Sequence, residues 1–315
     1  MGLELDRPRL IIISGPTASG KSRAALQLAL ALIDKGKPAE IISADSAQVY
    51  RYMDIGTDKL GQEEWQGIPH HLIDVVNPDE HFDAELFREM AGKEIDRIHR
   101  TGGAAILVGG TGFWIHALLY GLFPAPPRSD QVRQELRRTA AEKGAEHLHK
   151  KLAAIDPESA QRIHPHDLFR LVRALEVFEL TGHSLTQHFQ DQQREKPYDA
   201  LYLALNLDRH LLYQRIESRV DEMMGKVFLD EVKKLREMGY GPGLVSQKIL
   251  GYHQLHRHLD GEWTLDRAVH ELKAETRHYA RRQTIWLRKE KQVIWVDGAI
   301  AEARIQAEAK KFLEL

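Results

Sequence analysis

Short apolar runs that end at polar or glycine residues dominate the first third of the chain. Residues 9–14 (RLIIIS), 40–44 (EIISA) and 104–108 (AAILV) all have this form. Runs of this length without polar alternation are typical of strands buried on both faces, as in parallel sheets. The stretch 22–34 has apolar residues at helical spacing. Strand, helix and strand in this order predict a parallel α/β sheet with right-handed crossovers.

The middle of the chain has a different pattern. Residues 121–127 (GLFPAPP) contain three prolines, which stop helices and strands. From residue 129 to about 181 the apolar spacing is helical, and Asp156 followed by Pro157 predicts an N-cap and a first helical position. The glutamine-rich piece 187–194 has the composition of a solvated linker that leads back to the core. This region is therefore expected to be all-helical.

Strand-like runs return after the middle region, at 201–207 and 292–296. The pattern as a whole predicts an α/β catalytic core made of residues 1–121 and 197–315. It predicts an all-helical insertion domain at 122–196, because only helical spacing is found there.

A glycine-rich motif joins the first predicted strand to the first predicted helix. It reads GPTASGKS and fits G-x-x-x-x-G-K-[ST] in full. Glycines let several backbone N–H groups point at one anion, and the helix N-terminus adds partial positive charge. Lys21 supplies a cation, and the Ser22 hydroxyl is suited to holding Mg²⁺. The motif predicts a phosphate site in a P-loop NTPase-like sheet, formed by Gly15, Pro16, Thr17, Ala18, Ser19, Gly20, Lys21 and Ser22.

Asp45 follows the second predicted strand directly. Carboxyl ends of parallel strands face the ligand crevice. We expect the strand 40–44 to be the neighbour of the strand 9–14, so that Asp45 faces the bound phosphate. An N-cap for a following helix explains its position equally well. The strand 104–108 is followed by Gly-Gly-Thr-Gly and lacks the acid that NTPases use there to hold Mg²⁺. ATP hydrolysis is therefore a less favoured interpretation of the motif.

Composition narrows the class of protein. The chain has 315 residues, 43% of them hydrophobic, which is ample for a buried core. It has no cysteine, so disulfides and cysteine-ligated zinc are excluded. No apolar run approaches the roughly 20 residues that span a bilayer, and a cytoplasmic protein is expected. The seventeen histidines do not form a His-Glu-x-x-His pattern, so no transition-metal site is expected.

Several segments resemble the signatures of one enzyme family, and they follow one another in order along nearly the whole chain. They are residues 15–22, 45–50, 53–59, 70–74, 108–112, 167–181, 213–224, 251–252 and 276–287. The chain resembles the tRNA dimethylallyltransferases, also called tRNA isopentenyltransferases or IPP transferases. The resemblance is to the short bacterial type, because relatives with a zinc finger need cysteine. Ser22 replaces the commoner threonine and keeps the hydroxyl.

This resemblance implies a reaction and a set of catalytic residues. The family transfers a dimethylallyl group from dimethylallyl diphosphate to N6 of the adenosine 3′ to the anticodon of tRNA, with Mg²⁺, and its members suggest a monomer. The phosphate loop would hold the diphosphate. Asp45 is the candidate base, with the Thr17 hydroxyl as a second contact. Arg215 and Arg219 share a helical face, and Arg215 is the preferred candidate to act on the leaving diphosphate.

Contacts with tRNA are expected at positions given by the resemblance and by basic clusters. The resemblance implies Asp45, Ser46, Ala47, Gln48, Thr111, Arg133, Phe169, Arg170, Leu171, Val172, Arg173, Lys248, Gly251 and Tyr252. The basic run late in the chain adds Arg277 and Arg281. Such side chains contact RNA phosphates, although a solvated helix with acidic neighbours has the same composition.

Two other functions fit parts of the pattern. A P-loop small-molecule kinase would bind ATP on the same loop but would have no use for the basic helices. A non-catalytic RNA-binding module would bind tRNA without turnover and would leave the phosphate loop and Asp45 unexplained.

Overall fold

The computed structural model describes residues 7–122, 126, 128–191 and 196–315. The chain divides into two compact units, one formed by Met1–Leu119 with Lys196–Leu315 and the other by Tyr120–Glu195. The second unit spans nearly the same residues as the insertion expected at 122–196. Each unit has its own hydrophobic core.

The first unit is built on a six-stranded sheet in which every pair of neighbouring strands is parallel. The strands are β1 (Arg9–Ser14), β2 (Ala39–Ser43), β3 (His70–His71), β4 (Ala104–Gly109), β5 (Asp199–Asn206) and β6 (Ile294–Asp297). The predicted parallel α/β sheet is confirmed, and five strands begin and end within two residues of a predicted run. The two-residue strand β3 was not predicted, because two histidines carry no strand pattern.

The order of the strands differs from the expected one. It is β3-β2-β4-β1-β5-β6, so β4 lies between β1 and β2. The expectation that the strand of Asp45 is the direct neighbour of the phosphate-loop strand is therefore wrong. A crossover through α1 can skip one position in the sheet, and the next crossover then fills it with β4. Strand β4 pairs with β1 on one side and with β2 on the other.

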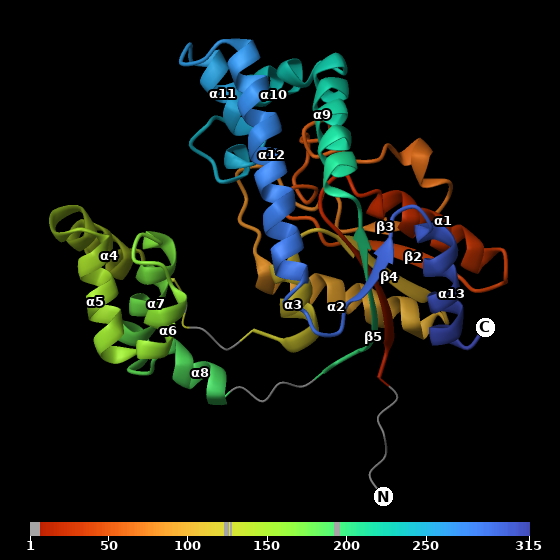
Figure 1. Cartoon of the computed structure of the whole chain (residues 1–315), viewed down its shortest axis with the longest axis horizontal. Coiled ribbons are helices and arrows are strands. Elements are labelled where there is room, and N and C mark those ends of the chain that lie inside the picture. The colour runs from red at the N-terminus through yellow and green to blue at the C-terminus, as the bar shows by residue number, and fades with distance from the viewer. Residues whose placement is uncertain (1–6, 123–125, 127, 192–195) are drawn as a thin grey trace, which may run out of the picture. The chain divides into compact units, whose positions relative to one another are not determined.

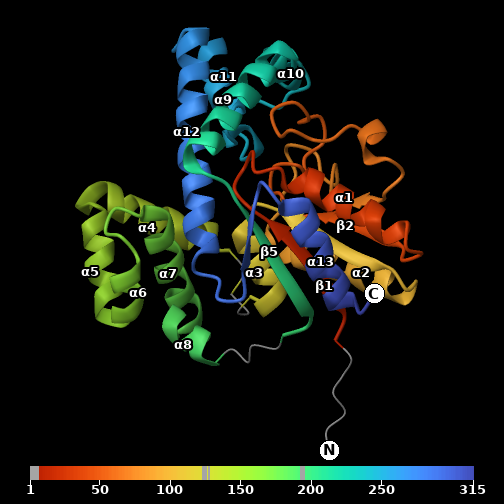
Figure 2. The same ribbon diagram turned by 45° about the vertical axis from the view of Figure 1, so that its right-hand side comes forward.

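Helices cover both faces of this sheet, which explains why its four inner strands, β2, β4, β1 and β5, are largely apolar and buried. The helices of the first unit are α1 (Lys21–Ile33), α2 (Ala84–Arg100), α3 (Gly112–Tyr120), α9 (Arg209–Gly225), α10 (Phe228–Glu237), α11 (Tyr252–Leu259), α12 (Leu265–Leu287) and α13 (Ala301–Leu313). Figure 2 shows α1 and α13 side by side over one face, where they bury Ile11 and Ile13 of β1. Helix α2 packs against β2 and β4. Helices α9 to α12 lie beyond the carboxyl ends of the strands (Figure 1).

The second unit contains only helices in its described residues. These are α4 (Asp130–Lys143), α5 (Ala145–Ile155), α6 (Pro157–Arg162), α7 (Leu168–Thr181) and α8 (Leu185–Asp191). Asp156 caps α6 by accepting a hydrogen bond from the Ser159 N–H, with Pro157 at the first turn, as its sequence predicts. Leucines of α4, α5 and α7 form the core of this unit. No helix in the described part of the whole chain is both long enough and apolar enough to cross a membrane.

Candidate active site

The phosphate loop connects β1 to α1 as the motif predicts. Gly20 takes a left-handed backbone conformation (φ 89°) immediately before α1, which a glycine adopts at little cost. The Ser19 hydroxyl is buried, with the residue 4% exposed, and has no hydrogen-bond partner among the described residues. Burial lowers the pKa of Lys21, while the Asp45 carboxylate opposes the shift. A buried cation and an unpaired hydroxyl beside a helix N-terminus suit an anionic ligand.

Asp45 lies close to the phosphate loop although β4 separates β2 from β1. The glycine at the end of β4 allows the backbones that follow β2 and β4 to approach each other. Thr111 N–H donates to the Ala44 carbonyl, 3.2 Å away, so the backbones that leave β2 and β4 run in contact. A Cβ added at Gly109 would lie less than 3.0 Å from the Ala44 backbone. The Asp45 carboxylate accepts a hydrogen bond from the Ala47 N–H at 3.0 Å, and no helix begins there. The N-cap interpretation is therefore wrong, and Asp45 lines the same cavity as Thr17 and Lys21.

Gln283 of α12 joins the phosphate loop to the end of β4. Its side-chain oxygen accepts from the Thr17 N–H at 2.8 Å, and its amide nitrogen donates to the Gly110 carbonyl at 2.9 Å. Gly110 leaves room for this side chain, because an added Cβ would lie less than 3.0 Å from its nitrogen. Gln283 lies in the segment 276–287, which resembles a family signature, but nothing in that segment indicates a role for it. Its two partners lie far away in sequence, so no local pattern could reveal the contact.

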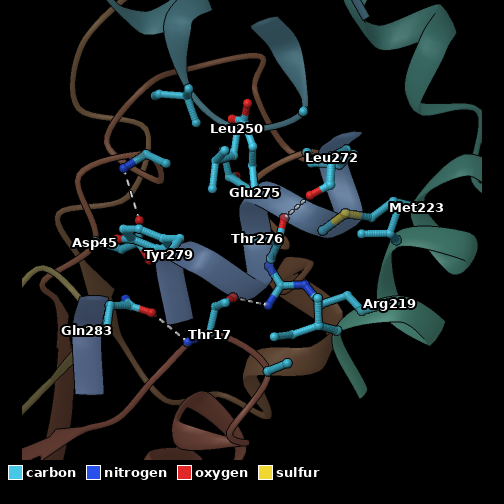
Figure 3. Close-up of a pocket in the computed structure, with 18 of the residues that line it drawn as sticks. Thr17, Asp45, Arg219, Met223, Leu250, Leu272, Glu275, Thr276, Tyr279 and Gln283 are labelled. Atoms are coloured by element: carbon cyan, nitrogen blue, oxygen red, sulfur yellow. Dashed lines mark hydrogen bonds between the residues drawn. The ribbon is translucent and has the colours of Figure 1, made fainter. Parts of the chain in front are cut away.

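The two candidate arginines of α9 have different surroundings. Arg219 donates a hydrogen bond to the Thr17 hydroxyl at 3.0 Å and forms an ion pair with Asp58 at 3.3 Å. Arg215, one turn earlier, lines a neighbouring depression with Ser22 and Glu222. Arg219 lines this depression too, together with Lys21 and Asp58, so both arginines lie beside the phosphate loop and, of the two, Arg219 also lines the cavity. Figure 3 shows the Arg219 guanidinium directed at Thr17.

A cavity of about 420 Å³ opens between the loop, Asp45 and helices α9 and α12. Its polar side is formed by Thr17, Lys21, Asp45 and Arg219. Tyr279 of α12 lies beside Asp45 (Figure 3), and burial together with that carboxylate raises the pKa of its hydroxyl. Apolar side chains line much of the rest of the cavity: Ile216, Val220, Met223, Phe228, Ile249, Leu250 and Leu272. Further polar residues lie among them: Ser46, Thr57, Lys248, Glu275, Thr276, Arg282 and Gln283. A charged end and an apolar end in one cavity fit an amphipathic ligand.

The donor atoms at the loop fit a hard divalent cation. Ser22 offers a hydroxyl and Asp58 a carboxylate in the same depression, and Mg²⁺ prefers such oxygen ligands together with phosphate oxygens. Among the described residues, no three His, Asp or Glu side chains are grouped so that they could hold a metal ion. A metal here would therefore depend on the phosphates of a bound ligand for most of its ligands.

The residues that were expected to contact tRNA near Asp45 have mixed roles. Thr111 accepts the Ser46 N–H at 3.0 Å and so orients the segment that follows Asp45. Gln48 bonds to the Ser43 hydroxyl and to the Thr57 carbonyl, which makes it part of the local fold. Ala47 lines the cavity.

In the segment 248–252, Lys248 and Gly251 line the cavity. Tyr252 is fully buried, and its hydroxyl donates to Glu231 at 2.6 Å. Tyr252 therefore offers no surface to RNA in this structure, and its role is packing.

The expected tRNA contacts of the second unit are also divided. Arg133 and Arg173 both donate to Glu176, whose side chain is fully buried. Leu171 and Val172 are buried in the helical core, so their side chains do not face RNA. Two of the expected residues are exposed: Phe169, which is 73% exposed, and Arg170. A resemblance between segments does not distinguish buried from exposed positions within a helix.

The basic residues of α12 differ in the same way. Arg277 is tied to Glu217 of α9 by an ion pair of 2.7 Å. Arg281 and Arg282 are exposed, and neither has an ion pair among the described residues. Arg282 lines the cavity and lies over the ring of Tyr279. These two guanidinium groups are therefore available to a polyanion.

Comparisons with known proteins agree with one another. The sequence model of a family described as IPP transferase matches residues 48–290. A tRNA dimethylallyltransferase of Geobacter metallireducens is 47% identical over 296 residues, which cover 93% of this chain and 94% of that protein. A protein of Syntrophus aciditrophicus named tRNA dimethylallyltransferase 2 is 44% identical, over 98% of both chains.

Solved structures give the same result. The full-length tRNA isopentenylpyrophosphate transferase of Bacillus halodurans superposes with a TM-score of 0.72 and 37% identity, over 98% of each chain. A eukaryotic dimethylallyltransferase described as acting on tRNA gives a TM-score of 0.82 at 26% identity, over 97% of this chain and 79% of that one. On the extent of these matches, the chain belongs to the IPP transferase family.

Proposed function

We propose that the protein is a tRNA dimethylallyltransferase that moves a dimethylallyl group from dimethylallyl diphosphate to N6 of the adenosine 3′ to the anticodon, and releases diphosphate. One observation carries the proposal. The phosphate loop and the Asp45 carboxylate line a single cavity that also has an apolar end. Such a cavity fits a short prenyl diphosphate with a nucleobase beside it.

The loop, Lys21 and Arg219 act on the leaving diphosphate. As the allylic C–O bond breaks, negative charge grows on the bridging oxygen, and donors that already point at this position stabilise it without rearrangement. Arg219 is held in place by Thr17 and Asp58 before any ligand binds. Mg²⁺, held by the Ser22 hydroxyl and the phosphates, would neutralise further charge on the diphosphate.

Asp45 acts on the incoming adenine. The exocyclic amine is a poor nucleophile, because its lone pair is delocalised into the ring. A carboxylate within hydrogen-bond reach orients the amine and accepts its proton as the N–C bond forms. The cavity lies between helices, so the adenine has to leave its stack in the RNA to enter it.

We further propose that the 122–196 region contacts tRNA through exposed residues such as Phe169 and Arg170, and that Arg281 and Arg282 contact phosphates near the cavity. The protein is proposed to act as a monomer in the cytoplasm. Arg133 and Arg173 contribute to tRNA binding only indirectly, since they shape the helical unit around Glu176.

The two other functions fit less well. A small-molecule kinase needs an acid to hold Mg²⁺ at the strand beside the phosphate loop, and β4 ends there in two glycines. A binding module without turnover leaves the cavity between Asp45 and the loop without a purpose.

The direct test is an incubation of the protein with dimethylallyl diphosphate, Mg²⁺ and unmodified tRNA, followed by mass spectrometry of the nucleosides. We expect the prenyl mass on one adenosine. Asp45→Ala should still bind tRNA but lose about 10²- to 10⁴-fold in turnover. Asp79→Ala is the matched control, because Asp79 is exposed and does not line the cavity. Unchanged turnover in Asp45→Ala would remove Asp45 from the role of base.

A further inference from the structure

The apolar end of the cavity has a wall that is unusually fixed. Ile216, Val220 and Met223 follow one another at helical spacing along α9 and line one side. Leu272, Glu275 and Thr276 of α12 line the other side, and the Glu275 carboxylate accepts a hydrogen bond from the Gln254 amide at 2.9 Å. The Thr276 hydroxyl donates to the Leu272 carbonyl at 2.7 Å, which satisfies the polar group within its own helix. In Figure 3, Met223 and Leu272 lie on the side of the pocket away from Asp45.

Phe228 lines the same apolar end, and the side of its ring that faces away from the cavity is closely packed. Its ring lies against Gly56 and Gly251, and a Cβ at either glycine would come within 3.0 Å of it. It meets the Tyr252 ring edge to face, with the ring centroids 5.1 Å apart. The ring therefore has no space to withdraw from the cavity.

The surroundings of Phe228 are themselves anchored. Glu231 accepts hydrogen bonds from the N–H groups of Ile55 and Gly56 and from the Tyr252 hydroxyl. Val227, a β-branched residue, is held at φ 62° immediately before Phe228. A side chain of this kind rarely takes a left-handed conformation, and it persists only where the surrounding structure fixes it. The start of α10, and with it the direction of Phe228, is thus firmly set.

We propose that Phe228, together with Met223 and Leu272, is the element that limits the prenyl donor to a single isoprene unit. This inference rests on the proposed function. With the diphosphate at the loop and its reacting carbon beside Asp45, the tail of the donor has to point to the apolar end. A second isoprene unit would occupy the space that the Phe228 ring fills. These three residues are specificity-determining positions and take no part in the chemistry.

The experiment compares two donors on one tRNA. The values of kcat/KM are measured for dimethylallyl diphosphate and geranyl diphosphate with the wild-type protein, Met223→Ala and Phe228→Leu. We expect the geranyl-to-dimethylallyl ratio of kcat/KM to rise by about 10- to 100-fold in the variants, the range that apolar pockets reach when they discriminate by a few carbons. Met223 is 7% exposed, whereas Phe228 is fully buried, so we expect Met223→Ala to disturb folding less. This variant therefore still tests the proposal if Phe228→Leu folds poorly.

Leu212→Ala is the matched control, because Leu212 is an equally buried residue of α9 that does not line this cavity. Its donor ratio should equal that of the wild type. Gly56→Ala tests the opposite direction: the added Cβ should push the Phe228 ring into the cavity and raise the KM for dimethylallyl diphosphate.

Two failures can be told apart. If the wild-type protein uses neither donor, the proposed function fails. If it uses dimethylallyl diphosphate but folded Met223→Ala and Phe228→Leu keep the wild-type ratio, or if the wild type uses geranyl diphosphate equally well, only this inference is overturned.

Discussion

Two arginines of the helical unit and two arginines of the catalytic unit have different surroundings. Those of the helical unit pair with a buried acid, whereas those of the catalytic unit line the cavity. In the helical unit, Arg133 and Arg173 converge on the fully buried carboxylate of Glu176. In the catalytic unit, Arg219 faces Thr17 and the exposed Asp58, and Arg282 lines the cavity without an ion pair among the described residues. A basic residue in a sequence therefore tells little about function until its acidic partner is known. The burial of that partner separates structural from ligand-binding arginines.

Removal of the Glu176 carboxylate should cause the largest loss in the free energy of unfolding. Glu176→Ala leaves two partly buried guanidinium groups without their partner, and breaking such a buried pair costs about 3–5 kcal/mol in the free energy of unfolding. Chemical denaturation measures this loss. Glu135→Ala is the control, because Glu135 is exposed and meets Arg138 at only 3.8 Å; we expect a change of about 0.5 kcal/mol or less. Equal stability of the two variants would show that the buried Glu176 cluster has no special structural role, and it would contradict the contrast with the arginines of the cavity.

The arginine of the cavity should affect turnover without affecting stability. Arg219→Ala is expected to lower kcat by about 10²-fold, because it removes a positioned donor to the leaving diphosphate. Its melting temperature should stay near that of the wild type. Arg215→Ala provides the comparison on the same helix and should lose less. A larger loss for Arg215→Ala would restore the order expected from sequence.

Acid should weaken the helical unit through the same cluster. Burial alone raises the pKa of Glu176, but hydrogen bonds from Arg133, Arg173 and the Ser129 N–H outweigh it, and the pKa lies below its ordinary 4.5. A carboxylate with a lowered pKa stabilises the fold fully above its unfolded pKa and loses this contribution as the pH falls through its folded pKa. Unfolding measured at decreasing pH, from about 6 downward, should show a shallower loss of stability in Glu176→Gln than in the wild type.

Substitution of an exposed arginine of α12 should modestly lower the affinity for tRNA and its dependence on salt. Arg281→Ala is expected to reduce the slope of log affinity for tRNA against log salt by about 0.7–0.9, the contribution of one phosphate contact. Titrations at several salt concentrations measure the slope. Arg277, which is tied to Glu217, is the matched comparison on the same helix. An unchanged slope for Arg281→Ala would place that residue outside the RNA interface.

The smallest expected change in stability comes from relieving the backbone strain at Val227. Val227→Gly relieves a left-handed β-branched residue, and we expect a gain in stability of about 1 kcal/mol. Thermal unfolding detects it. A loss of stability would indicate that the exposed Val227 side chain makes contacts that outweigh the strain.

Much of the fold could be predicted, because the inner strands β1, β2, β4 and β5 are largely buried and so have few polar interruptions. The phosphate loop could be predicted as well, since its chemistry lies in eight consecutive residues. The strand order could not, because apolar runs do not encode which strand lies between two others. The contacts of Gln283, Asp58 and Phe228 could not either, since each depends on residues distant in sequence.

The side chain of Gln283 has a consequence for how the two substrates influence each other. One amide group touches both the loop that faces the donor and the end of β4, and it belongs to the helix that carries Arg281 and Arg282. A shift of that helix would be felt at the Thr17 amide through the Gln283 side chain. If RNA displaces the helix, thermodynamic reciprocity requires that the RNA and the prenyl donor alter each other's affinity by the same factor.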